Sequence, residues 1–181
     1  ATGPVINDSA VFSMSLGQMS EIFFMLIMPL FFVRLGVKWM LAVGMLAWVV
    51  RYGLFHLGMP EGTAWMLLVG VALHGICYDF FFVTGQIYVE KKSTPAVRGQ
   101  AQGLLVLVTY GVGMLIGAQV AGAVYNSFLA GRDALPLAEW TQFWWIPAAF
   151  AGAVLILFVL LFNDRVDRTT ASVDPSGDAL T

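Results

Sequence analysis

The sequence predicts an all-α membrane protein with five transmembrane helices, and three observations support this prediction. Hydrophobic residues make up 59% of the 181 residues, whereas charged residues make up only 11%. Mean hydropathy is +0.82, which is more apolar than a soluble domain of this size can bury in one core. The apolar residues also form long continuous stretches rather than short alternating ones, which favours helices in lipid over barrel strands. This composition excludes a disordered chain and a cytosolic enzyme.

Each expected span passes the roughly 20 residues needed to cross the hydrocarbon core of a bilayer. The first span carries Glu21 midway and ends at the basic turn Arg34–Lys38. The second span carries Arg51 and has His56 close to its outer end. In order, the five expected spans are Ala10–Val33, Val37–Leu57, Thr63–Tyr88, Val97–Tyr125 and Trp140–Phe162.

The last three spans have features of their own. The third contains the polar and aromatic segment His74–Phe82. The fourth is rich in glycine, and Gly113 and Gly117 form a small-residue pattern that lets helices approach closely. The fifth begins with three tryptophans, as expected where a helix enters the membrane interface.

Lysine and arginine predict the orientation. Of the 9 basic residues, Arg51 lies within a span and Arg132 alone lies at one set of helix ends. The other set of ends, which the positive-inside rule places in the cytoplasm, holds Arg34, Lys38, Lys91, Lys92, Arg98, Arg165 and Arg168. The N-terminus is therefore expected outside the cell, and the polar segment 164–181 is expected to be a disordered cytoplasmic tail.

An odd number of spans is typical of a six-helix half that has lost its first helix. The chain also begins with Ala1 rather than Met. We therefore expect residues 1–163 to be part of the C-terminal half of a longer transporter. The net charge of −2 gives no reason to expect a nucleic-acid partner.

Charged side chains at the centre of a span cost about 2.5–3.5 kcal/mol on insertion scales, so they usually have a function. Glu21 shares a helix face with Gln18 and with Met14, Met25 and Met28, because these residues are spaced by three or four positions. An amide and a carboxylate at this spacing can bind one ligand. Helix packing alone explains the methionines.

A second group of polar side chains lies in the third span. His74 and Tyr78 are four residues apart and project from one face, and Asp79 lies on the adjacent face. Together they offer an imidazole, an aromatic plane and a carboxylate, which suit a small planar ligand. In a low dielectric Asp79 can carry a proton. For His74 alone, an ordinary core histidine remains an equal alternative.

The other polar residues of the spans have simpler explanations. For Arg51 we expect a structural ion pair or snorkelling rather than a substrate contact. The single cysteine, Cys77, is expected to be a small packing residue. The sequence has no metal-ligand spacing, nucleotide-binding loop or nucleophile motif, so neither a metal, a cofactor nor an enzymatic reaction is expected.

Several segments resemble one transporter family. The turn Arg34-Leu35-Gly36-Val37-Lys38 resembles the R-x-G-x-K core of a loop motif of the major facilitator superfamily, without the preceding Asp. From about Ser15 to Phe162 the sequence resembles the nucleoside:proton symporters, the bacterial nucleoside permeases. The segments that carry this resemblance are Gln18-Met19-Ser20-Glu21, Tyr78-Asp79-Phe80-Phe81, Val89-Glu90-Lys91, Pro95-Ala96-Val97-Arg98 and Ala101-Gln102-Gly103.

The resemblance implies proton-driven nucleoside uptake across the inner membrane, with these spans as helices eight to twelve of twelve. It assigns nucleoside contacts to Gln18 and Glu21, and it places His74, Tyr78 and Asp79 along the same site. His74 and Tyr78 replace the Tyr and Phe of the family pattern, whereas the carboxylate is kept. Asp79, or else Glu21, would carry the coupled proton. The missing N-terminal half and the lipid bilayer are the implied partners.

Two alternatives remain open at this point. One is a major facilitator transporter for another small polar solute, such as a sugar. The other is a membrane enzyme or a subunit that does not transport. An enzyme would need a nucleophile or metal cluster, and a structural subunit would not need carboxylates at mid-span.

Overall fold

The computed structural model describes residues 10–163, and within this range all regular structure is helical. The expected tail 164–181, with Arg165 and Arg168, lies outside the described residues. Two of the elements, η1 and η2, are π-helical segments, in which the backbone is wound more widely than in an α-helix. In chain order the elements are α2 (Ala10–Gly58), α3 (Ala64–Ala72), α4 (His74–Cys77), η1 (Tyr78–Val83), α5 (Thr84–Lys92), α6 (Arg98–Val106), η2 (Leu107–Gly113), α7 (Met114–Leu129) and α8 (Leu137–Leu161).

Four helical stretches in the described range are long and apolar enough to cross a membrane. They are Met14–Gly58, Ala64–Lys92, Arg98–Leu129 and Leu137–Leu161. The prediction of an all-helical membrane protein is confirmed. The last three stretches match the third, fourth and fifth expected spans to within about one helical turn. The first two expected spans both lie within α2.

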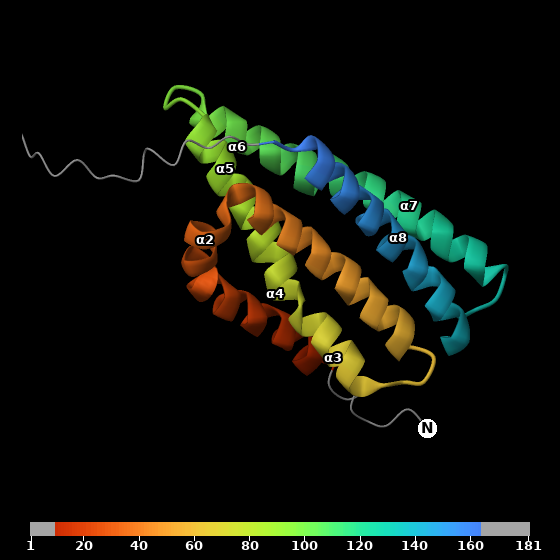
Figure 1. The fold of residues 1–181 in the computed structure, drawn as a ribbon. Helices are drawn as coiled ribbons and strands as arrows, with labels where there is room; N and C mark the ends of the chain where they lie inside the picture. Colours follow the sequence, from red (N-terminus) through yellow and green to blue (C-terminus); the bar gives the residue numbers. More distant parts are fainter. Residues whose placement is uncertain (1–9, 164–181) are drawn as a thin grey trace, which may run out of the picture.

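Gly36 divides α2 into two halves. Its backbone is not helical, with φ of 70° and ψ of 176°. A positive φ costs glycine little because it has no Cβ, so glycine suits this position in the basic turn. Figure 1 shows that the chain reverses direction between the two halves of α2 (red and orange) and that α4 is drawn between these halves. Met28 from the first half and Met40 from the second are both buried in one cluster.

The core lies where the second half of α2 crosses the stretch 64–92. Phe80 of η1 is buried against Met28 and Met40. Gly44 lets the backbones approach closely, because a Cβ there would lie 2.8 Å from the backbone nitrogen of Phe81. On its other side, the second half of α2 packs against α8 through Val37, Leu41 and Met45. The stretch 98–129, by contrast, has no fully buried residue.

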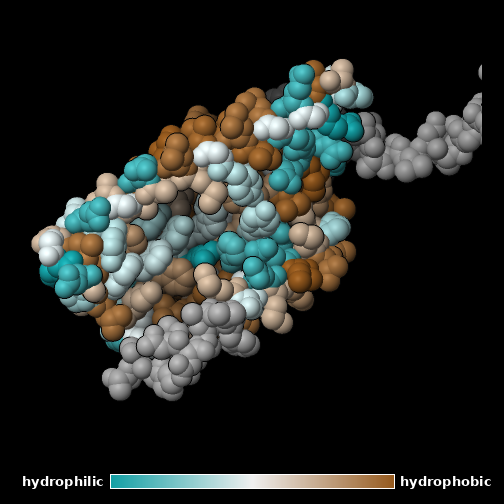
Figure 2. All heavy atoms as spheres, turned by 180° about the vertical axis from the view of Figure 1, so that it is seen from behind, coloured by the Kyte–Doolittle hydropathy of each residue, from teal (hydrophilic) through white to brown (hydrophobic). Residues whose placement is uncertain are grey.

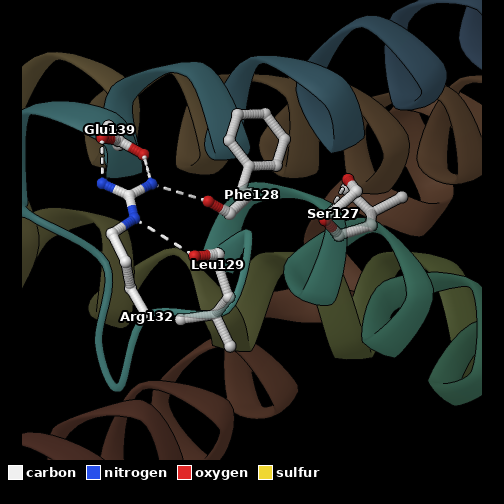
Figure 3. A network of polar contacts seen from close by, with 6 residues as sticks. Ser127, Phe128, Leu129, Arg132 and Glu139 are labelled. Atoms are coloured by element: carbon white, nitrogen blue, oxygen red, sulfur yellow. Dashed lines mark hydrogen bonds and ion pairs between the residues drawn. The ribbon is translucent and has the colours of Figure 1, made fainter.

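Arg132 orders the connection between α7 and α8 (Figure 3). Its guanidinium donates hydrogen bonds to the carbonyl oxygens of Leu129 and Phe128 at 3.1 and 2.8 Å. It also binds both carboxylate oxygens of Glu139, at 2.7 and 2.6 Å. Arg132 thus satisfies free carbonyls at the C-terminal end of α7 and ties them to the first turn of α8.

Candidate functional site

A cavity of about 350 Å³ lies between the two halves of α2 and the start of the stretch 64–92. Its volume falls within the range typical of small-molecule sites. On the face opposite to that of Figure 1, Figure 2 shows a hollow that is bordered by hydrophilic and near-neutral residues. The cavity is lined by Met14, Gly17, Gln18, Glu21, Arg51, Val71 and His74.

Three ionisable side chains form a continuous chain along the cavity. His74 Nε2 lies 3.1 Å from Glu21 Oε1. On the other side of the imidazole ring, Nδ1 lies 2.7 Å from Arg51 Nη1. The side chains of His74 and Glu21 are 39% and 25% exposed, so both are accessible to a ligand. These three side chains connect the first half of α2, the second half of α2 and α4.

The backbones of α2 and α4 are in contact at Gly75. A Cβ at this position would lie 2.5 Å from the carbonyl carbon of Ser20 and 2.7 Å from the nitrogen of Glu21. The Gly75 N–H donates a hydrogen bond to Ser20 Oγ at 3.1 Å, and Ser20 Oγ donates to the Gly17 carbonyl at 2.6 Å. This close approach places His74 and Glu21, the neighbours of Gly75 and Ser20 in sequence, beside each other.

Aromatic side chains continue from the cavity along η1. The His74 and Tyr78 rings are 6.2 Å apart, and the Tyr78 and Phe82 rings are 5.5 Å apart. The Tyr110 hydroxyl, from η2, donates a hydrogen bond to the Tyr78 hydroxyl at 3.0 Å. The two π-helical segments therefore meet at this pair of tyrosines, and π-helical segments are frequent at functional sites.

Asp79 is fully buried in η1, with a relative exposure of 0%. Among residues 10–163, neither of its carboxylate oxygens has a hydrogen-bond partner. A charged carboxylate is costly to bury, because the hydration that it loses must be replaced by hydrogen bonds or by an opposite charge. Asp79 does not line the cavity itself, although it directly follows Tyr78.

The structure brings together three of the five residues proposed for substrate binding. Gln18, Glu21 and His74 line the cavity, whereas Tyr78 and Asp79 lie beyond it along η1. Arg51 lines the cavity too, and its partner is His74. The sequence showed Arg51 as a rare charge within a span, but its place in the cavity depends on how α2 folds back. Tyr110 was not anticipated, and nothing in the sequence distinguishes it from other tyrosines.

The comparisons with known proteins agree with this arrangement of helices. Residues 2–167 match the family model described as nucleoside H+ symporter. The chain belongs to the nucleoside H+ symporter family. Its helices are accordingly those of a multi-pass membrane protein.

Within residues 10–163, no group of three or more His, Cys, Asp or Glu residues is arranged to hold a metal ion.

Three proteins similar to this chain come from Escherichia coli K12. The putative nucleoside transporter YegT is 37% identical over 93% of this chain and 41% of its own length. The nucleoside permease NupG is 33% identical over 87% of this chain and 37% of its own length. The xanthosine permease is 32% identical over 90% of this chain and 38% of its own length. The chain thus spans about two fifths of each of these relatives.

Solved structures of the nucleoside transporter NupG have the same fold. One crystal structure superposes with a TM-score of 0.74 at 31% identity, covering 88% of this chain and 39% of the NupG chain. A crystal structure of a NupG variant gives a TM-score of 0.77 at 30% identity, covering 87% and 39%. The helices described above therefore have their counterparts in about two fifths of a nucleoside transporter.

Proposed function

We propose that this chain forms part of a proton-coupled transporter that takes up nucleosides across the bacterial inner membrane. One observation carries the proposal: Gln18 and Glu21, from the segment Gln18-Met19-Ser20-Glu21 that resembles the family, line the cavity together with His74. A carboxylate accepts hydrogen bonds from hydroxyl groups, and an amide both donates and accepts. These are the groups needed to bind a sugar with an attached base. The names of the relatives, which are nucleoside permeases, support the same substrate class.

We infer that the two halves of α2 are separate spans. Residues 1–163 would then supply five helices, the eighth to twelfth of a twelve-helix major facilitator fold. The non-helical backbone of Gly36 and the reversal of the chain there support this count. The partners of residues 1–163 would be the preceding helices of the complete transporter and the lipid bilayer. The stretch 98–129 is apolar and largely exposed, so it offers a surface for either partner.

We infer the orientation from charge. The turn at Arg34 and the end of α5 at Lys91 and Lys92 would face the cytoplasm, together with the C-terminus. The connection that holds Arg132 would face the periplasm, as would the N-terminus. The support is that basic residues concentrate at one set of helix ends.

For proton coupling we propose Asp79, with Glu21 as the competing assignment. Asp79 is a buried carboxylate without hydrogen-bond partners in the described part of the chain, and it follows Tyr78, whose ring lies beside that of His74. A conformational change that admits water to Asp79 would favour release of a proton. Binding of the proton and of the nucleoside would thereby depend on the same movement of η1.

Equilibrium binding tests the proposed substrate class. The complete transporter is purified in detergent and titrated with radiolabelled uridine. We expect saturable binding that unlabelled nucleosides displace and hexoses do not. Displacement by a hexose, with none by nucleosides, would instead support the alternative of a sugar transporter.

A further inference from the structure

The imidazole of His74 has a different partner on each of its two nitrogens. Arg51 Nη1 lies 2.7 Å from Nδ1, and Glu21 Oε1 lies 3.1 Å from Nε2. Both distances are within the range of direct hydrogen bonds, so no intervening water is needed. Arg51 is itself held in place, because its guanidinium lies over the ring of Phe55 at 5.5 Å.

The partners determine where the imidazole proton lies. A guanidinium only donates hydrogen bonds, so Nδ1 must be the acceptor and carries no hydrogen. A neutral imidazole then has its single N–H at Nε2, where it donates to the Glu21 carboxylate. In a doubly protonated ring, Nδ1–H would point at the N–H groups of Arg51, and two donors cannot form a hydrogen bond with each other. The arrangement therefore fits only a neutral His74 with its hydrogen on Nε2.

We propose that Arg51 is a positioning residue for substrate binding, which acts on Glu21 by fixing the tautomer of His74. The Nε2–H holds one carboxylate oxygen of Glu21, which lines the cavity, and the other oxygen would accept a hydrogen bond from a donor group of the ligand. The hydroxyl groups of a nucleoside are such donors. Both nitrogens of His74 are engaged, so His74 presents its ring to the ligand and acts chiefly through Glu21. The identity of the ligand in this proposal rests on the proposed function, whereas the tautomer of His74 does not depend on it.

Nitrogen NMR of the protein labelled with ¹⁵N-histidine tests the tautomer directly. The His74 signals are assigned by their loss in His74→Gln. We expect an unprotonated Nδ1 and a protonated Nε2 in the wild type and in Arg51→Lys, which keeps a donor. In Arg51→Met we expect a mixture of tautomers or a charged ring. Arg98→Met is the matched control, since Arg98 pairs with Glu90 at 3.6 Å and does not line the cavity, and it should leave the His74 signals unchanged.

Two results would overturn the proposal. One is a protonated Nδ1 on His74 in the wild type. The other is a spectrum of folded Arg51→Met identical to that of the wild type. If Arg51→Met does not fold, the wild-type spectrum and that of Arg51→Lys decide the question, because a different tautomer in Arg51→Lys also contradicts the proposal.

A double-mutant cycle tests the effect on binding. Arg51→Met should weaken the affinity for uridine about tenfold, as expected for a lost hydrogen bond to a charged group. In a Glu21→Gln background the same substitution should cause little further loss, because Arg51 acts through Glu21. Additive losses would mean that Arg51 contacts the ligand independently, and the positioning role would be wrong. Absence of uridine binding in the wild type would contradict the proposed function. It would not affect the conclusion about the tautomer of His74, which NMR measures independently.

Discussion

His74 Nε2 lies 3.1 Å from the Glu21 carboxylate and thereby connects α4 to the first half of α2. This contact holds a carboxyl group at the wall of the cavity, which Gln18 also lines. The proposed binding role of Glu21 follows from this position.

Glu21→Gln keeps the shape of the side chain but removes its charge. We expect the affinity for uridine to fall about tenfold or more, because a hydrogen bond to a charged group is worth about 1.5–3 kcal/mol. Equilibrium binding to the complete transporter measures the effect. Glu61→Gln is the matched control, since Glu61 is exposed in the turn before α3 and should leave the affinity unchanged. An unchanged affinity in Glu21→Gln would reduce Glu21 to a structural partner of His74.

Gly75→Ala should separate α2 from α4, because the added Cβ would lie 2.5 Å from the backbone of Ser20. Backbone atoms cannot yield as a flexible side chain does, so we expect a loss of stability of about 1–3 kcal/mol. We also expect weaker uridine binding, since His74 and Glu21 would move apart. Thermal unfolding in detergent and equilibrium binding measure the two effects. Gly85→Ala, where a Cβ meets nothing within 4 Å, is the control and should have neither effect.

Asp79→Asn mimics a permanently protonated carboxylate. In the complete transporter we expect it to permit uridine binding and exchange but to abolish accumulation driven by a pH gradient. Proteoliposomes with an imposed gradient measure accumulation, and preloaded vesicles measure exchange. Because two carboxylates can titrate as a coupled pair, Glu21→Gln is measured in parallel. Should Asp79→Asn still concentrate uridine while Glu21→Gln does not, the proton site belongs to Glu21.

The orientation is testable with single cysteines. Cys77 is the single cysteine of the sequence, so Cys77→Ala provides a background without a native thiol in this chain. A cysteine at Ser93, just after α5, should react with an impermeant reagent only in opened cells. A cysteine at Ser127, near the end of α7, should react in intact cells. Labelling of position 93 from outside intact cells would contradict the proposed orientation.

Much of this arrangement follows from simple features of the sequence. The length and apolarity of the spans determine the helices, because backbone polar groups in lipid must bond within the segment. The spacing of Gln18 and Glu21 determines that they share a face, and both line the cavity. These predictions depend only on local periodicity, which the sequence contains directly.

Other features depend on contacts between distant segments, and periodicity does not reveal them. The backbone is π-helical at Tyr78–Val83 and at Leu107–Gly113, and Asp79, near the start of the first of these segments, lies buried rather than on the cavity wall. Arg51 reaches His74 only because α2 reverses at Gly36, which returns residue 51 to the level of Glu21. The pairing of Tyr110 with Tyr78 likewise joins residues 32 positions apart.

We propose above that these helices belong to a transporter that couples nucleoside uptake to the proton gradient. The decisive experiment measures uptake of radiolabelled uridine by cells that express the complete transporter, with and without a protonophore. We predict uptake above that of cells without the transporter, accumulation against the uridine gradient, and loss of that accumulation when the protonophore is added. Uptake that stays the same with the protonophore, or no uridine uptake by a correctly inserted transporter, would contradict the claim.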